Sequence, residues 1–276
     1  MDISVVIPSY NREGPLVRAL NSVTNQTSQV NEIIVIDDGS SDNTADIIRQ
    51  RFPDVKLIRQ TNRGVSAARN SGIKLAEAEW IALLDSDDEW LPEKIDTIRR
   101  AQKNNLHDIL FHSDEIWIRN GTRVNQMNKH AKYGGEIFQH CLPLCVISPS
   151  AAVIHRSVFE QTGLFNENLP ACEDYDLWLR LCHRFEVFYI DRPLIKKYGG
   201  HEDQLSRKYW GMDRFRIRAL HELMTLPTLQ QKQKQQTVNM LLKKLRILIK
   251  GAQKHNNHEI LDEFLPLLDI YENISC

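Results

Sequence analysis

The chain has 276 residues, of which 42% are hydrophobic and 26% are charged, with a formal net charge of −1 at pH 7. This balance is typical of a globular protein, and the near-zero charge argues against a nucleic-acid binder. No run approaches the roughly 20 apolar residues of a transmembrane helix, and the chain begins directly in a strand-like segment. None of the five cysteines belongs to a CxxC pair, so we expect reduced thiols rather than a zinc site. The composition therefore predicts a soluble, cytoplasmic protein.

Strand and helix signals alternate from the N-terminus to about residue 100. Short apolar, β-branched runs predict strands at 3–7, 33–36, 55–58 and 80–84. Apolar residues at helical spacing predict the intervening helices, over 15–24, after a cap at Ser41 or Asp42, over 66–78, and from Pro92. This alternation predicts an α/β fold with a mostly parallel central sheet flanked by helices.

Beyond about residue 105 the alternation loosens. Further strands are expected at 108–117, 150–155, 185–190 and 194–198, with helices over 156–162 and 174–183. From about Trp210 onward only helical patterns remain. We therefore divide the chain into an α/β domain, residues 1–209, and a helical C-terminal extension, residues 210–276.

An apolar stripe at helical spacing runs along the C-terminal extension and comprises Val238, Leu241, Leu242, Leu245, Leu248, Ile249 and Ala252. Lysines and Arg246 occupy much of the remaining surface, and no acid occurs between Glu222 and Glu259. The stripe is expected either to pack on the α/β domain or another subunit, or to lie on an anionic membrane near lipid-linked acceptors. Packing is favoured because several charges sit close to the stripe. The membrane alternative would place the protein peripherally, at the inner face of the membrane.

Polar segments follow three of the predicted strands, at 8–12, 37–40 and 85–88. In sheets of this kind, ligands bind beyond the carboxyl ends of the strands. Carboxylates crowded at a strand end repel one another unless a cation or ligand relieves the repulsion. Asp85 and Asp87 are therefore predicted to hold Mg²⁺ or Mn²⁺ and to leave metal positions open to a diphosphate. An isolated Asp-x-Asp is more often a turn or a cap, and it is the position after a strand that favours the metal.

The acidic segment after the second strand suits a nucleotide base. Asp38 can accept a hydrogen bond from N3–H of uracil, while Gly39 and Ser40 form the turn and Asp42 caps the next helix. Uridine is the preferred base because a carboxylate matches its N3–H. Guanine and thymine also offer donors, so the choice of base stays open.

Five segments, in this order and at suitable spacings, resemble the family 2 glycosyltransferases of the GT-A fold. They read VVIPSYNR at 5–12, IDDGSSD at 36–42, NRGVSAARN at 62–70, LDSDD at 84–88 and EDYDLWLR at 173–180. The resemblance covers roughly residues 3–205. It implies a nucleotide-diphospho-sugar transferase fold, with residues 1–209 as the catalytic domain, and a divalent-metal-dependent transfer that inverts the anomeric carbon.

The resemblance also implies roles for individual residues. Those that bind the nucleotide sugar are Pro8, Tyr10, Arg12, Asp38, Arg69, Asp85 and Ser86. Asp85 and Asp87 hold the metal, Glu173 lies on the acceptor side, and Asp174 is the general base. A carboxylate base is needed because a sugar hydroxyl is a poor nucleophile until its proton is removed. Without the other motifs, Glu173 and Asp174 would be read as acids that favour a helix N-terminus.

Two further residues have open alternatives. His201 follows two glycines that permit a close backbone approach, and it is weighed equally as a ligand of the metal or diphosphate and as a surface residue. Trp178 is an acceptor-side candidate that could stack on a sugar, although its helical spacing with Leu181 favours core packing.

The functional prediction is a hexosyltransferase-type enzyme that moves a sugar from a nucleoside diphosphate, preferably a UDP-sugar, to an acceptor hydroxyl. The expected acceptor is a glycan or a lipid-linked glycan in the assembly of cell-surface polysaccharide, and no nucleic-acid partner is expected. The alternative from another class is a non-catalytic protein that binds a nucleotide sugar. A dinucleotide-binding oxidoreductase is disfavoured because Pro-Ser-Tyr-Asn, rather than a glycine-rich turn, follows the first strand.

Overall fold

The computed structural model describes residues 1–200 and 209–275 of the chain. The N-terminal part alternates β1 (Ile3–Ser9), α1 (Glu13–Thr24), β2 (Glu32–Asp37), α2 (Thr44–Arg51), β3 (Lys56–Arg59), α3 (Val65–Leu75) and β4 (Trp80–Leu83). The middle part contains β5 (Glu89–Trp90), α4 (Lys94–Asn104), β6 (Leu110–Arg119), β7 (Thr122–Val124), α5 (Phe138–Cys141), β8 (Val153–His155), α6 (Arg156–Thr162), α7 (Glu173–Cys182) and β9 (Phe188–Gly199). Three helices complete the chain: α9 (Asp213–Met224), α10 (Gln231–Lys254) and α11 (His258–Ser275).

One sheet organises the α/β part, with the strand order β3-β2-β1-β4-β8-β6-β9-β5 and with β7 paired to β6. The first four strands pair in parallel, as the alternating pattern predicts. The second half is mixed: β6 and β9 are parallel, whereas β8 runs antiparallel to β4 and β6, and β5 runs antiparallel to β9. The prediction of an α/β fold with helices on the sheet is confirmed, and the parallel pairing is concentrated in its N-terminal half.

Buried residues cover both faces of the sheet. Along β1, Val5 and Ile7 belong to the cluster that includes α1 and α4, whereas Val6 belongs to the cluster that includes α3 and α7. This alternation is expected of a strand covered on both faces. Helix α3 lies close against the sheet at Gly72, where a Cβ would stand 2.3 Å from the Val6 side chain.

Some element boundaries differ from the prediction. The expected strand at 150–155 is a turn of 3₁₀ helix at Pro149–Ala151 followed by β8, and α4 begins at Lys94 rather than Pro92. The two strands expected at 185–190 and 194–198 are one strand, β9, with an irregular register against β6 near Asp114. A proline lies at each of these places, at positions 92, 149 and 193. Proline can interrupt a strand pattern, form a turn or begin a helix, so its local sequence does not decide between these outcomes.

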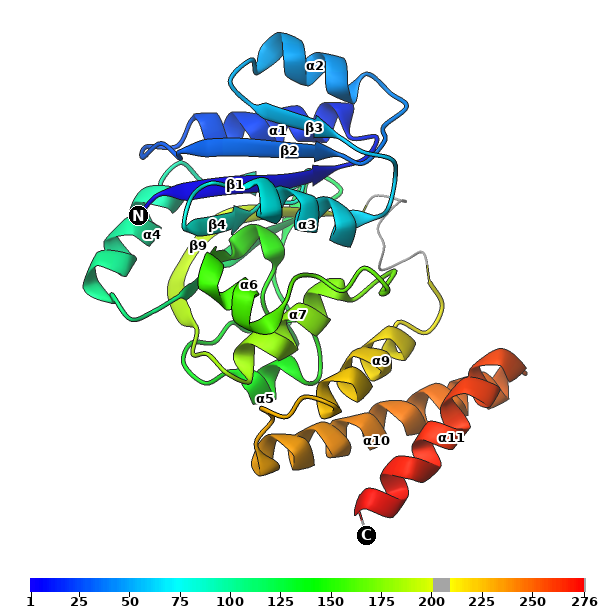
Figure 1. The fold of residues 1–276 in the computed structure, drawn as a ribbon. Coiled ribbons are helices and arrows are strands. Elements are labelled where there is room, and N and C mark those ends of the chain that lie inside the picture. The colour runs from blue at the N-terminus through cyan, green and yellow to red at the C-terminus, as the bar shows by residue number, and fades with distance from the viewer. Residues whose placement is uncertain (201–208, 276) are drawn as a thin grey trace.

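The C-terminal helices gather at the end of the molecule opposite α2 and β3 (Figure 1). Every member of the apolar stripe of α10 is buried, in the same core cluster as α7 and α3. The packing alternative is therefore confirmed for the stripe itself. No described helix is long and apolar enough to cross a membrane.

Candidate active site

The acidic turn after β4 has one buried and two half-buried carboxylates. Asp88 is buried: its Oδ2 accepts from Ser150 Oγ at 2.6 Å and its Oδ1 accepts from the Tyr198 backbone N–H at 2.9 Å. The same Ser150 hydroxyl accepts from the Asp85 N–H at 3.1 Å. Asp85 and Asp87 are half-buried and stay open to solvent. Burial, and then the charges of Asp87 and Asp85, raise the pKa of Asp88 well above its ordinary value. The carboxylates are thus crowded, as the sequence predicts.

Arg69 joins this turn to the segment that carries the candidate base. Its side chain lies on α3 and is 4% exposed, with Nη2 donating to Asp85 Oδ1 at 2.6 Å and Nη1 donating to Glu173 Oε1 at 2.8 Å. Burial alone would lower the pKa of Arg69, but the charges of Asp85 and Glu173 outweigh this effect. The pKa of Arg69 is therefore raised, and the guanidinium stays charged. The resemblance assigns Arg69 to the nucleotide sugar, and the structure places it as a bridge between two acidic motifs.

The neighbouring Asn70 fixes the loop that leads to α7. Its side-chain amide donates to the Phe165 carbonyl at 2.9 Å and accepts from the Phe165 N–H at 2.9 Å, so it pairs with this backbone as a neighbouring strand would. The same Nδ2 also donates to Glu167 Oε1 at 2.9 Å. Arg69 and Asn70 together therefore hold the segment 165–173 against α3, a role that local sequence patterns did not reveal.

Asp174 lies in the first turn of α7, where the helix dipole favours a negative charge. Its Oδ1 accepts from the Tyr175 N–H at 2.7 Å, and its Oδ2 accepts from the thiol of Cys145 at 3.1 Å. The preceding Cys172 has a left-handed backbone (φ 62°), which turns the chain into the helix. Asp174 is half-buried, so it remains reachable from the site.

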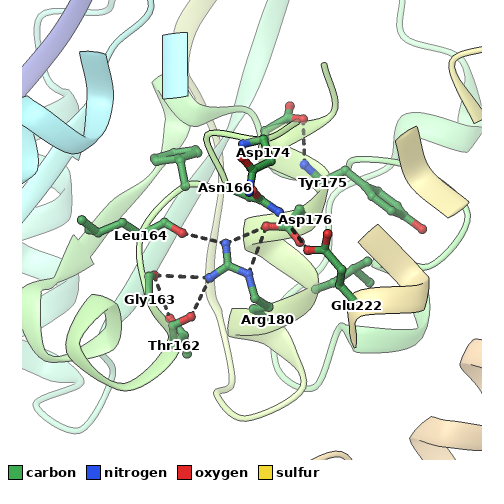
Figure 2. A network of polar contacts seen from close by, with 12 residues as sticks. Thr162, Gly163, Leu164, Asn166, Asp174, Tyr175, Asp176, Arg180 and Glu222 are labelled. Carbon is green, nitrogen blue, oxygen red and sulfur yellow. Dashed lines mark hydrogen bonds and ion pairs between the residues drawn. The ribbon is translucent and has the colours of Figure 1, made fainter. Parts of the chain in front are cut away.

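A second network fixes the far side of α7 (Figure 2). Arg180 donates to the carbonyl oxygens of Thr162 and Leu164, at 2.6 and 2.8 Å, and to Asp176 Oδ2 at 2.7 Å. Burial raises the pKa of Asp176, and Arg180 counters this rise. Asp176 and Arg180 belong to the EDYDLWLR segment, yet they serve to lock α7 to the end of α6. This rigid helix is what orients Asp174.

The candidate base-binding residues lie at the ends of β1 and β2. Tyr10 is 48% exposed and leaves a ring face open, whereas Pro8 is buried within β1. Asp38 is 3% exposed, and it accepts from the Gln60 side chain at 2.8 Å and from the backbone N–H groups of Arg63 and Gly64, at 3.0 and 2.8 Å. Asp38 therefore organises the loop before α3. Its contact with a base stays a prediction.

Asp42 was predicted to cap α2, but the cap position is Asn43, whose side chain makes no capping hydrogen bond. Asp42 instead closes the turn before the helix, because its Oδ1 accepts from the Thr44 N–H at 3.1 Å. Burial opposes ionisation of Asp42, but the hydrogen bonds from Thr44 outweigh it and lower its pKa. Ser86, assigned to the nucleotide sugar, is 8% exposed inside the acidic turn.

A pocket of about 340 Å³ opens beside Asp87 and is lined by Arg12, Arg18 and Tyr198, among others. The Arg18 guanidinium stands 3.8 Å from the centre of the Tyr198 ring and donates to the Asp87 carbonyl at 2.6 Å. Its buried Nε has no hydrogen-bond partner within the described residues. Arg12 belongs to a motif that is recognisable in the sequence. Arg18 does not, and it is brought to the pocket by its position on α1.

Trp178 and His201 are the remaining residues predicted to belong to the site. Trp178 is 0% exposed and lies within the core of α7, so its assignment to the acceptor side is wrong: no surface of the ring is available to a sugar. Core packing, the other alternative, is confirmed. His201 falls outside the described residues. Among residues 1–200 and 209–275, no three His, Cys, Asp or Glu side chains converge as a metal site.

Comparison with known proteins places the chain in context. The family model described as glycosyl transferase family 2 matches residues 4–163. An Escherichia coli protein named UDP-Glc:alpha-D-GlcNAc-diphosphoundecaprenol beta-1,3-glucosyltransferase WfgD is 33% identical over 209 residues, which are 74% of this chain and 79% of that protein. An uncharacterized glycosyltransferase of Rickettsia conorii is 32% identical over 197 residues, 70% of this chain and 32% of the relative. The match spans about a third of the length of the Rickettsia conorii and Rickettsia felis relatives.

Solved structures share the fold. S. aureus TarS, residues 1–349 in complex with UDP, aligns with a TM-score of 0.70 at 20% identity and covers 91% of this chain and 72% of that chain. Its complex with UDP-GlcNAc aligns with the same TM-score over 73% of that chain. Because the family model covers more than half of the residues and a relative at 33% identity aligns over most of both chains, this protein belongs to glycosyl transferase family 2 and has the GT-A fold.

Proposed function

We propose that this chain transfers a sugar from a UDP-sugar to an acceptor hydroxyl, with inversion and with a divalent metal, during the assembly of a cell-surface glycan. One observation carries the proposal: Arg69 binds Asp85 in the acidic turn and Glu173 beside the candidate base, at 2.6 and 2.8 Å. This bridge holds the donor-side motif and the acceptor-side motif at one edge of the sheet. A displacement reaction needs these two motifs on opposite sides of one anomeric carbon.

The donor half of the site suits a nucleoside diphosphate. Tyr10 offers an exposed ring beside Asp38, and the pocket at Asp87 is lined by the guanidinium groups of Arg12 and Arg18. Guanidinium groups match the oxygens of a diphosphate in charge and geometry. The complexes of TarS with UDP and UDP-GlcNAc, and the UDP-Glc in the name of WfgD, support uridine as the base.

The acidic turn fits a divalent metal. Asp85 and Asp87 supply carboxylate oxygens at the carboxyl end of β4. Burial, and then the charges of Asp87 and Asp85, raise the pKa of the neighbouring Asp88, and a bound cation would relieve the repulsion between these charges. Two protein ligands leave positions for diphosphate oxygens and water, which is how Mg²⁺ is usually held. When bound, the metal stabilises the negative charge that develops on the leaving nucleoside diphosphate.

Asp174 takes the acceptor proton. It is half-buried, lies in the first turn of α7, and is oriented by the Tyr175 N–H and the Cys145 thiol. As the acceptor oxygen bonds to the anomeric carbon, its proton passes to Asp174 and the bond to the diphosphate breaks. A single displacement of this kind inverts the anomeric carbon.

The acceptor is proposed to be a glycan, free or linked to a lipid diphosphate. The α-D-GlcNAc-diphosphoundecaprenol in the name of WfgD supports the lipid-linked form.

The first test is a thermal-shift screen of UDP, GDP, TDP and CDP, each with and without Mn²⁺. Metal-enhanced stabilisation by UDP alone is expected, and it should be lost in Asp87→Asn but retained in Asp191→Asn, which alters an exposed acid. Release of UDP from a UDP-sugar then separates the transferase from a protein that only binds nucleotide sugars. Binding without release from any donor and acceptor would overturn the enzymatic proposal.

A further inference from the structure

The outward face of α10 carries a row of lysines. Lys232, Lys243, Lys250 and Lys254 are all exposed and are separated by 11, 7 and 4 residues. These spacings correspond to about three, two and one helical turns, so the four side chains share one face of the helix over roughly 33 Å. We call these four residues the lysine face.

No acid on α10 itself offsets the lysine face, and Glu272 of the neighbouring α11 binds Arg246 at 2.9 Å. No Asp or Glu occurs between Glu222 and Glu259, and none of the four lysines forms an ion pair with any residue in the described part of the chain. The nearby Lys244 differs, because it is buried and binds Asp213 at 2.9 Å. The lysine face is thus an excess of cations on a protein whose net charge is −1.

One apolar side chain lies among these cations, and another lies beside the C-terminal end of the helix. Ile247 is 58% exposed and stands one turn from both Lys243 and Lys250. Trp210 is 45% exposed and its ring lies 6.3 Å from that of His255, beside the C-terminal end of α10. Lysines interspersed with exposed Ile and Trp are suited to the boundary between lipid headgroups and acyl chains, where tryptophan is enriched. An exposed isoleucine would add little to the affinity for a nucleic acid, because the phosphate backbone dominates that affinity.

The same helix is packed against the candidate active site. Lys244 Nζ donates to the Pro143 carbonyl at 2.9 Å, and Cys145, two residues further on, donates to Asp174. The buried side of α10 therefore contacts the segment that orients the base, while its lysine face points away. A surface bound to the lysine face would lie about one helix diameter, roughly 10 Å, from that segment.

We propose that the lysine face of α10 docks the protein onto an anionic lipid bilayer, with Ile247 and Trp210 entering the headgroup region. Each lysine near an anionic surface adds favourable electrostatic energy, and the apolar side chains add a component that salt does not screen. The contact goes beyond the proposed transfer reaction. It does not require that reaction, since binding is measured without turnover.

The test is sedimentation of the full chain with vesicles of phosphatidylcholine that contain about one third phosphatidylglycerol, compared with pure phosphatidylcholine. The variant Lys243→Glu/Lys250→Glu/Lys254→Glu is expected to bind the anionic vesicles at least about tenfold more weakly. Its matched control is Lys74→Glu/Lys103→Glu/Lys129→Glu, which changes the net charge equally at exposed lysines elsewhere. This control should change binding less than about twofold. Ile247→Asn should weaken the binding that persists at about 1 M salt.

Several outcomes would overturn the docking proposal. These are no binding of the unaltered protein to anionic vesicles, equal binding to neutral vesicles, or equal losses in the two triple variants. Tighter binding to duplex DNA than to the vesicles at the same salt would assign the face to nucleic acid. A dimer in sedimentation velocity that the first triple variant abolishes would assign it to self-association. Nucleotide-induced thermal shifts report folding separately, and they should be unchanged in both triple variants.

Discussion

The thiol of Cys145 donates a hydrogen bond to Oδ2 of Asp174 across 3.1 Å. Burial and the Asp174 charge raise the pKa of Cys145 well above its ordinary value, so the thiol stays protonated at neutral pH. The contact thus joins the candidate base to the loop before the 3₁₀ turn. It holds Oδ2 in place while leaving the carboxylate free to accept a proton.

This relationship predicts the reactivity of the thiol. Asp174→Asn removes the negative charge that helps to raise the Cys145 pKa, so alkylation of Cys145 should become faster, on the order of tenfold for each pKa unit recovered. Peptide mapping by mass spectrometry after a timed iodoacetamide treatment measures this rate. Glu160→Gln, an exposed acid on α6, serves as the control and should leave the rate unaltered. Slower alkylation in Asp174→Asn would show that the carboxylate does not act on the thiol.

Asp174→Asn should also remove transfer while preserving donor binding. Loss of a general base lowers turnover by about 10² to 10⁴-fold, whereas Tyr10, Asp38 and the acidic turn are untouched. We expect UDP release to fall by at least about 10²-fold with an unaltered thermal shift by UDP and Mn²⁺. Near-normal turnover in this variant would remove Asp174 from the mechanism.

Replacing Arg69 should lower the free energy of unfolding. Arg69→Met leaves the buried Glu173 and the half-buried Asp85 without their cation, which costs about 3 to 5 kcal/mol for a buried pair. Chemical denaturation measures this loss. Arg69→Lys should restore only part of it, because an ammonium cannot reproduce the planar two-carboxylate geometry.

The double variant Arg69→Met/Glu173→Gln tests the cause of that loss. It should be more stable than Arg69→Met alone, since it no longer contains an unpaired buried carboxylate. Arg49→Met is the control, because Arg49 forms an exposed pair with Asp46 and should contribute less than about 1 kcal/mol. Equal losses in Arg49→Met and Arg69→Met would contradict the bridge.

Ser150 should affect the affinity for Mn²⁺ although it is not a proposed metal ligand. Its hydroxyl donates to Asp88 and accepts from the Asp85 N–H, so Ser150→Ala frees the acidic turn and leaves the buried Asp88 short of a donor. A lost buried hydrogen bond costs about 1 to 3 kcal/mol. We expect the Mn²⁺ concentration for half-maximal stabilisation by UDP to rise about tenfold or more. Ser157→Ala removes a hydroxyl that lies 2.8 Å from His155 Nδ1 at the start of α6, and it should leave the Mn²⁺ dependence unchanged.

Lys94 should make stability rise with pH. Its side chain is 0% exposed, its Nζ donates to the Ala151 carbonyl at 2.9 Å, and burial lowers its pKa from 10.5 to about 7. The unfolded chain therefore binds more protons than the folded chain between pH 7 and pH 10.5, so the free energy of unfolding should increase through this window. The gain from pH 7 to pH 9 is about 2 kcal/mol.

Urea denaturation at the two pH values, with Lys94→Met alongside, isolates this contribution from other titrating groups. The increase between pH 7 and pH 9 should be smaller in the variant by about 2 kcal/mol. Identical pH dependence in both proteins would mean that Lys94 stays charged in the folded state or is reached by water.

Local patterns in the sequence determined the elements and the chemical type of the site. The predicted helices over 15–24 and 174–183 correspond to α1 (Glu13–Thr24) and α7 (Glu173–Cys182), because a buried face repeats every 3.6 residues. The acidic and polar segments after β1, β2 and β4 meet at one edge because these strands are parallel neighbours. The mixed second half of the sheet was less predictable, since a strand's own pattern does not state the direction of its partner.

Only the tertiary structure decided which residues act together. Arg69 and Glu173 are 104 positions apart, and Cys145 and Asp174 are 29 apart, so no spacing rule links them. The same is true of Arg18 at the pocket and of the buried Trp178, whose helical pattern fits either a core or a ligand. A sequence period fixes the face on which a side chain lies, but the partner on that face is set by how distant elements pack, and therefore by the whole chain.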